Sequence, residues 1–137
     1  MLKKTAFYTL LGVFMFLSFS QAAAAGDDEL VVLWTSGDPE VAEKVCFMYT
    51  HNAKIQGWFD KVTLVVWGPS SRLLAETPGL QEKVRAMMED GIKVEACVAC
   101  ANMYGVSQDL RDIGIDVKGM GVPLTEYLKS EARVLTF

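Results

Sequence analysis

The chain contains two apolar stretches that are continuous or nearly so, Leu30–Trp34 and Val62–Trp67. Such runs are typical of strands that are covered on both faces, as in a parallel sheet. Three weaker strand candidates follow, at 93–96, 115–118 and 133–137. Lys118 places a charge at the end of the fourth candidate, which predicts that this strand lies at an edge of the sheet.

Helical patterns fill the segments between the predicted strands. Asp38-Pro39-Glu40 has the residue types of a helix start, and the helix is expected to reach Gln56 and stop at Gly57. Its apolar residues form two adjoining stripes, which predicts contact with more than the sheet: Val41, Val45, Met48 and Ile55 on one, and Ala42, Cys46, Tyr49 and Ala53 on the other. Further helices are expected at 70–76, 78–90, 98–104, 107–113 and 123–129.

This alternation predicts an α/β fold, a three-layer α/β/α sandwich around a mostly parallel five-stranded sheet. Ligands of such sheets bind at the carboxyl ends of the strands. Here those ends carry the candidate ligand-binding residues Trp34, Ser36, Trp67, Ser70, Ser71, Arg72 and Met120, together with Cys97.

The first residues have the pattern of a bacterial secretory signal. Lys3 and Lys4 precede an apolar run from Ala6 to Phe19, and the small residues at 22–25 are suited to a signal peptidase. A single membrane anchor is the alternative, but the run is short for a spanning helix, which needs roughly 20 residues. We therefore expect a signal peptide at 1–25, a domain at 26–137, a periplasmic or secreted location, and no membrane attachment after cleavage.

Composition and charge narrow the function. The chain has 137 residues, enough for one ordinary domain, and its 51% hydrophobic content indicates a folded protein. The formal charge is −4 without a basic cluster, which disfavours nucleic-acid binding. No P-loop, dinucleotide-binding glycine motif or catalytic triad stands out, so hydrolase, NTPase and dehydrogenase functions lack support.

The most specific chemical signal is the Cys-x-x-Cys at Cys97 and Cys100. Cys97 is expected where the third strand ends and a helix begins, and free backbone N–H groups there favour a thiolate. A thiolate is the nucleophile of sulfur transfer and of disulfide exchange, and Cys100 is spaced to resolve a bond formed at Cys97.

Other interpretations of the pair remain open. A structural zinc needs about four ligands, and only Cys46 and His51 could complete the set, so we expect neither a metal ion nor a cofactor. A thioredoxin-type dithiol is a second alternative, and an idle buried pair is a third.

The residues around the pair resemble those of a known family. The stretch 91–106 (GIKVEACVACANMYGV) is similar to the DsrE/DsrF-like family, which includes small subunits of sulfur-relay complexes. The matching positions are Cys97, Ala99, Ala101, Gly105 and Val106. The segments 65–68 and 121–127 also resemble short, single-domain members, and the likeness covers roughly 30–137.

This resemblance implies that Cys97 accepts sulfane sulfur as a persulfide, in a sulfur carrier or a sulfurtransferase-like protein. It also implies a homotrimer or hexamer, and a sulfur donor or acceptor that is either a protein or a small sulfur compound. The alternatives are a non-catalytic oligomeric binding module and a periplasmic dithiol/disulfide redox protein.

Two smaller hypotheses concern neighbouring strand ends. Ser70, Ser71 and Arg72 could bind an anion at a helix start, although an ordinary capped turn is the favoured explanation. Trp34 and Trp67 either wall one pocket or pack as core aromatics.

Overall fold

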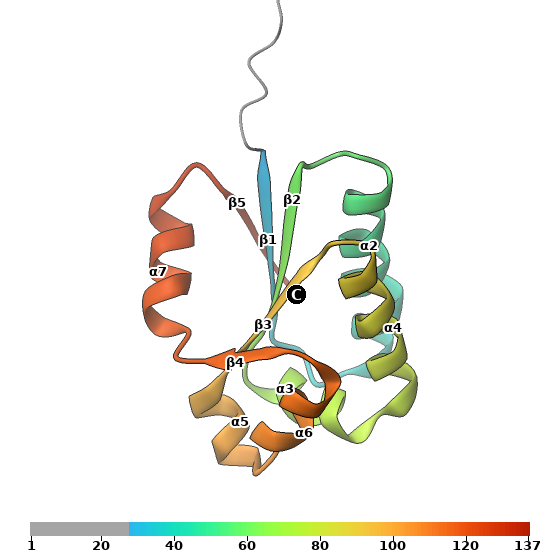
Figure 1. Ribbon diagram of the computed structural model, residues 1–137, viewed down its shortest axis with the longest axis vertical. Coiled ribbons are helices and arrows are strands. Elements are labelled where there is room, and N and C mark those ends of the chain that lie inside the picture. Colours follow the sequence, from blue (N-terminus) through green and yellow to red (C-terminus); the bar gives the residue numbers. More distant parts are fainter. Residues whose placement is uncertain (1–27) are drawn as a thin grey trace, which may run out of the picture.

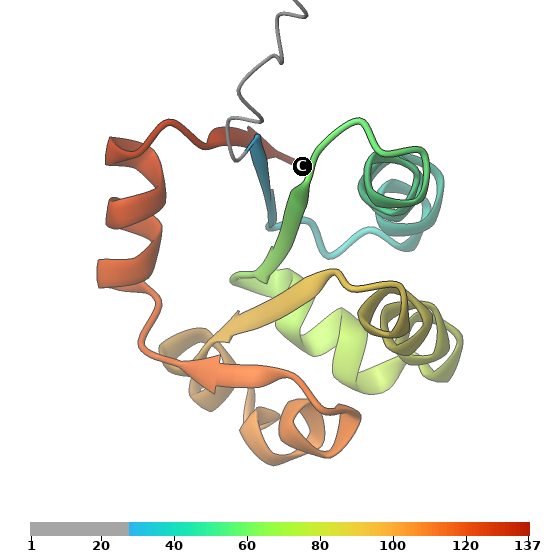
Figure 2. The same cartoon turned by 45° about the horizontal axis from the view of Figure 1, so that its top comes forward.

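The computed structural model describes residues 28–137 and contains one sheet of five parallel strands (Figures 1 and 2). The signal segment expected at 1–25 lies outside the described residues. The strand order is β4-β3-β2-β1-β5, and every neighbouring pair is parallel. The strands are β1 (Glu29–Trp34), β2 (Lys61–Val66), β3 (Lys93–Cys97), β4 (Asp116–Lys118) and β5 (Arg133–Thr136).

The α/β fold and the position of the fourth strand at a sheet edge are therefore confirmed. The helical segments are α1 (Pro39–Val41), η1 (Ala42–Phe47), α2 (Met48–Ile55), α3 (Pro69–Glu76), α4 (Pro78–Glu89), α5 (Val98–Tyr104), α6 (Ser107–Ile113) and α7 (Gly121–Lys129). Each strand candidate and each helix candidate from the sequence corresponds to one of these elements or to a consecutive group of them.

The first helical segment begins as its residue types predict and then departs from a regular helix. The Asp38 carboxylate accepts hydrogen bonds from the backbone N–H groups of Glu40 and Val41 and so caps the helix. Residues Ala42–Phe47 form a π-helical stretch, which the sequence analysis did not predict. Near the C-terminal end of this stretch, the Thr50 hydroxyl donates a hydrogen bond to the Cys46 backbone carbonyl at 2.6 Å.

The two faces of the sheet are covered unequally. Helices α2 and α4 lie on one side of the sheet, α7 lies on the other, and α3, α5 and α6 gather near the carboxyl ends of the strands (Figure 1). On one face of the sheet, alternate strand residues such as Val32, Leu64 and Val94 enter the larger core, which helices α3, α4 and α6 also help to form. We call this side of the sheet the opposite face, because it lies across the sheet from Cys97.

The other face, which we call the cysteine face, carries Val31, Val65 and Cys97. Its helix α7 contains no buried residue, so α7 is less deeply packed against the sheet than the helices on the opposite face. Among residues 28–137, none of the helices has the length and apolar character needed to cross a membrane.

Candidate functional site

Cys97 stands at the end of a central strand, where the chain turns into a helix. It is the last residue of β3 and the N-cap of α5, as the sequence predicted. Alternation along β3 turns the Cys97 side chain toward the cysteine face, and only 4% of the residue is exposed.

Cys100 lies in the first turn of α5 and brings a second sulfur to the same place. Its thiol shares a hydrogen bond with Cys97 and is close enough to the Gly68 backbone to receive a hydrogen bond from it. Burial, followed by the hydrogen bond with Cys97, raises the pKa of Cys100, and the contact with Gly68 opposes this only in part. Neither cysteine is in a disulfide, so the site is a pair of free thiols in contact.

The two cysteines belong to a small buried cluster of five residues, which we call the cysteine cluster: Val31, Val65, Cys97, Cys100 and Met120. Met120 is the N-cap of α7 and is 1% exposed, so it reaches the cluster from the loop after β4. Trp67 and Tyr127 pack against the cluster and are only partly buried. The thiols therefore lie in a buried apolar cluster to which β1, β2, β3, α5 and the start of α7 contribute side chains.

A charged network lies on the cysteine face beside this cluster. Glu95 is fully buried, two residues before Cys97 on β3, so both side chains point to the same face. Its carboxylate accepts hydrogen bonds from Lys118 Nζ at 2.7 Å and from the Tyr127 hydroxyl at 3.0 Å, and Lys93 Nζ forms an ion pair with it. Lys118 also pairs with Asp116, and Lys93 donates to the Tyr127 hydroxyl.

The network keeps a buried carboxylate ionised. Burial alone raises the pKa of Glu95, but the hydrogen bonds from two lysines and Tyr127 outweigh burial and lower it below its ordinary value. In return, the hydrogen bonds to Asp116 and Glu95 raise the pKa of Lys118. A buried charge that was left without these partners would strongly destabilise the fold.

Sequence analysis gave no role to Glu95. The available signal was its position: an acidic residue on the same side of a covered strand as Cys97 needs a cation, and Lys93 and Lys118 lie on the same strand and on the next one. The network also binds Tyr127 of α7 to the sheet. Because α7 buries no residue of its own, these hydrogen bonds help to hold the helix over the cysteine cluster.

The two tryptophans do not wall one pocket. Trp34 pairs in register with Val66 and is fully buried on the opposite face, where its ring meets Phe47 edge to face. Trp67 is one residue beyond Val66, so its side chain turns to the cysteine face. Trp34 is a core aromatic, and only Trp67 reaches the cysteines.

The serine and arginine candidates are separated as well. The Ser70 hydroxyl donates to the Trp34 carbonyl at 2.6 Å and accepts from the Trp67 backbone N–H, so it joins two strand ends instead of facing a ligand. Ser71 is buried and its hydroxyl has no hydrogen-bond partner. The Arg72 guanidinium lies over the Tyr104 ring at the far end of α5.

The Ser36 hydroxyl forms a local contact as well, since it accepts a hydrogen bond from the Asp38 backbone N–H. A local turn therefore accounts for Ser36, the link between two strand ends accounts for Ser70, and the structure does not bring these two and Arg72 together as one anion site. Of the predicted ligand-binding residues, the structure brings Trp67 and Met120 to Cys97 and Cys100.

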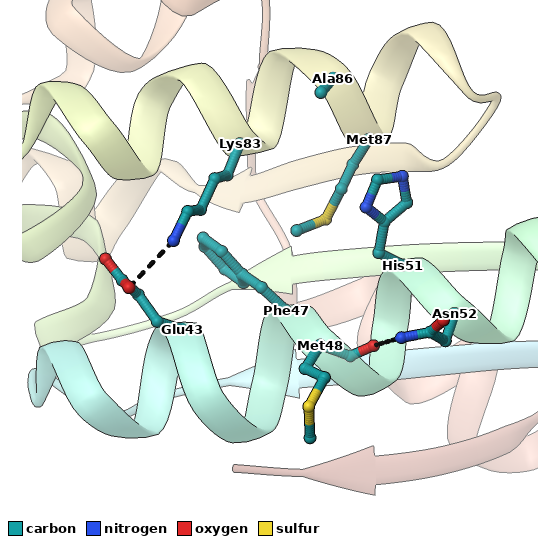
Figure 3. A pocket seen from close by; sticks show the side chains of 8 residues that line it. All are labelled: Glu43, Phe47, Met48, His51, Asn52, Lys83, Ala86 and Met87. Atoms are coloured by element: carbon teal, nitrogen blue, oxygen red, sulfur yellow. Dashed lines mark hydrogen bonds and ion pairs between the residues drawn. The ribbon is translucent and has the colours of Figure 1, made fainter.

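A separate cavity of about 260 Å³ lies between α2 and α4 on the opposite face (Figure 3). Phe47 and Met87 form part of its apolar lining, and the ion pair between Lys83 and Glu43 lies at one end. His51 also lines it, and its Nε2 lies 2.6 Å from the Asp90 carboxylate. These polar groups have partners within the chain, and no cysteine lines this cavity.

The third cysteine is remote from this chemistry. Cys46 is fully buried in the core of the opposite face, and burial raises its pKa to about 12, an increase that the hydrogen bond with Thr50 only partly opposes. Cys46 and His51 are therefore not available to complete a zinc site with the pair. Within residues 28–137, no three His, Cys, Asp or Glu side chains are grouped to hold a metal ion.

Comparisons with known proteins agree with this architecture. A family model described as the DsrE/DsrF-like family matches residues 13–137. A conserved protein of unknown function from Bacteroides thetaiotaomicron, BT1422, is 35% identical, with a TM-score of 0.79 over 84% of this chain and 99% of that one. The comparison with curated proteins found no match.

Two more distant structures share the fold at 16% identity. The ychN protein from E. coli has a TM-score of 0.63, with 82% of this chain and 100% of that chain covered. A protein of unknown function from Methanobacterium thermoautotrophicum, MTH1491, has a TM-score of 0.68, with 81% and 100% covered. At this level of identity, the likeness supports the fold alone.

Proposed function

This chain belongs to the DsrE/DsrF-like family, and on that basis we propose that it binds or relays sulfane sulfur as a persulfide on Cys97, with Cys100 as the resolving thiol. The observation that carries the proposal is the contact between the two free thiols within a buried, largely apolar cluster at the carboxyl end of β3. A sulfur-relay role is also what the resemblance around Cys97 implies.

The loading step is a sulfur transfer between thiols. The Cys97 thiolate attacks the outer sulfur of a donor persulfide, the S–S bond of the donor breaks, and the donor leaves as a thiolate. Cys97 then carries the sulfur with its hydrogen. No net electron transfer occurs, because one S–S bond replaces another. Burial of Cys97 within the cysteine cluster limits the access of solvent to this reactive species.

Release has two routes that differ in their products. An acceptor thiolate takes the outer sulfur and restores the Cys97 thiolate, which is a relay. Alternatively, the Cys100 thiolate attacks the inner sulfur and expels hydrosulfide, which leaves a Cys97–Cys100 disulfide that an external thiol must reduce. The raised pKa of Cys100 favours its neutral thiol at neutral pH, which slows this second route.

The order of these roles can be tested by two serine substitutions. Cys97→Ser should abolish sulfur loading, whereas Cys100→Ser should load normally and hold the persulfide longer. Loading is measured as the mass gained on exposure to a persulfide donor, and lifetime as the loss of that mass with time. Retained loading in Cys97→Ser would reject Cys97 as the acceptor, and an unchanged lifetime in Cys100→Ser would reject the resolving role.

A second candidate function is an oligomeric binding module. The outer stripe of the first helical segment exposes Val45, Met48 and Ile55, with exposed fractions of 41%, 57% and 54%, and Trp58 follows at 54%. In the adjoining stripe, Ala42, Cys46 and Ala53 are buried and Tyr49 is partly buried. An apolar outer stripe of this kind is suited to a second copy of the chain, and a homotrimer or hexamer is the proposed assembly.

The two functions separate when both cysteines are replaced. A binding module with Cys97→Ser and Cys100→Ser should keep its solution mass and its ligand, whereas a relay protein should keep its mass and lose its activity. The proposed export is tested by N-terminal sequencing of the protein from a bacterial periplasm. A start at Gly26 supports cleavage of the signal, and an intact Met1 contradicts it.

A further inference from the structure

Three sulfur-containing side chains, and not two, belong to the buried cluster on the cysteine face. Cys97, Cys100 and Met120 are exposed by 4%, 5% and 1%, and they belong to one buried cluster. They come from three different elements: the end of β3, the first turn of α5, and the N-cap of α7. The other two members of the cluster, Val31 and Val65, offer no polar atom. The sulfur-relay proposal gives no role to the Met120 thioether.

We propose that Cys97, Cys100 and Met120 form a binding site for a soft monovalent metal ion, Cu(I). Thiolates and thioethers are the ligands that soft ions of this kind select, whereas hard divalent ions need oxygen ligands, and the Glu95 carboxylate on the same face is already held by Lys93, Lys118 and Tyr127. The sequence analysis expected no metal because it counted only Cys and His ligands. The structure adds Met120, which is far from the pair along the chain and beside it in space.

The donor set does not suit zinc or an iron–sulfur cluster. A closed zinc site is tetrahedral and needs four ligands, and iron–sulfur clusters are held by four cysteines or by cysteine with histidine. The remaining Cys and His side chains cannot serve as a fourth ligand here: Cys46 lies in the core of the opposite face, and His51 pairs with Asp90 beside the α2–α4 cavity. A low-coordinate ion is therefore the occupant that three sulfurs can satisfy.

Charge and proton balance are compatible with this occupant. Binding removes the protons of Cys97 and Cys100 to solvent, and no electron moves because the copper enters as Cu(I). Two thiolates, a neutral thioether and one cation leave a single negative charge. The contact between the Cys100 sulfur and the Gly68 backbone stabilises that charge, while Glu95 and Asp116 are already compensated by lysines.

The test is a competition titration of the reduced protein with Cu(I), held reduced by ascorbate in the absence of oxygen and thiols, against a chromogenic Cu(I) chelator. Met120→Leu keeps a buried side chain of similar volume and removes the sulfur. Met87→Leu is the matched control, because Met87 is also 1% exposed but lies in the core of the opposite face.

The expected result is one Cu(I) per chain, lost in Cys97→Ser and weakened about tenfold or more in Met120→Leu, since even indirect partners of a metal contribute 10- to 100-fold. Met87→Leu should bind like the wild type. Three results would each overturn the proposal. The first is Cu(I) binding that is no tighter in the wild type than in Cys97→Ser, and the second is equal Cu(I) affinity in Met120→Leu and Met87→Leu. The third is Zn(II) binding to the wild type that is as tight as Cu(I) binding.

Sulfur loading is measured on the same variants, so this proposal and the sulfur-relay proposal fail separately. Met120→Leu should still accept sulfur on Cys97, because the thioether takes no part in the transfer. Persulfide loading without Cu(I) binding would remove the metal site alone. Cu(I) binding without loading would remove the relay alone.

Discussion

Tyr127 attaches α7 to the cysteine face through its hydroxyl, and Tyr127→Phe removes that hydroxyl while keeping the ring. The hydroxyl donates to the buried Glu95 carboxylate at 3.0 Å and accepts from Lys93 at 3.3 Å. The ring also packs against the cysteine cluster, and α7 buries no residue of its own. We therefore expect the substitution to favour states in which α7 moves away and exposes Cys97.

The size of the effect follows from the type of bond. A hydrogen bond to a charged group contributes about 1.5–3 kcal/mol to stability. Because Tyr127 is only half-buried, we take the lower end of that range, about 1.5–2 kcal/mol. If reagents reach Cys97 through local opening of α7, a loss of about 1.5–2 kcal/mol raises the fraction of molecules with α7 open about 10- to 30-fold. The rate at which Cys97 is labelled rises by the same factor.

The assay is alkylation of the native protein at neutral pH, with each labelled cysteine assigned by peptide mass. Tyr49→Phe is the matched control, because Tyr49 packs against Trp58 on the first helical segment, away from the cysteine face. Cys46 is the internal control for global unfolding. Equal Cys97 labelling rates in the two tyrosine variants would refute the reasoning, as would faster labelling that Cys46 shares.

The buried charges and thiols lead to three more expectations. Glu95→Gln should lower the free energy of unfolding by about 1–3 kcal/mol at neutral pH. The lowered pKa of Glu95 means that its contribution is present above the unfolded pKa of about 4.3 and is lost as pH falls through the lower folded value. Urea unfolding curves of the two proteins should therefore converge in acid, and a difference that is constant with pH would contradict the network. Because the pKa of Cys100 is raised, hydrosulfide release from the loaded protein should accelerate about tenfold per pH unit near neutrality, and a flat profile would contradict Cys100 as the attacking thiol. Cys46 should resist alkylation at pH 8 until urea unfolds the chain, given its burial and its pKa of about 12; labelling in the native state would contradict its placement.

The sheet could be predicted because its signal is local. Continuous apolar runs such as those in β1 and β2 identify buried parallel strands, and the Asp38 cap and Gly57 mark the ends of the first helical segment. The π-helical stretch was not predictable in this way. Ala42–Phe47 has the composition of an ordinary helix, and its distinguishing feature is a change in backbone hydrogen bonding.

The site was predicted in part, for a related reason. The position of Cys97 at a strand end follows from local sequence, and its contact with Cys100 follows from their spacing. The separation of Trp34 from Trp67 depends on a single residue of strand register, which a pattern of apolar residues does not fix. The partners of Glu95 come from β3, β4 and α7, so the network exists only once the chain has folded.

The role of Cys97 as a sulfur acceptor is tested most directly by intact mass. The mass of the protein is measured before and after exposure to a persulfide donor, with and without reductant, and the change is mapped to a peptide. We predict a gain of one sulfur atom on Cys97 that reductant removes. A Cys97–Cys100 disulfide that is inert to the donor would contradict it and would favour a structural or dithiol redox pair.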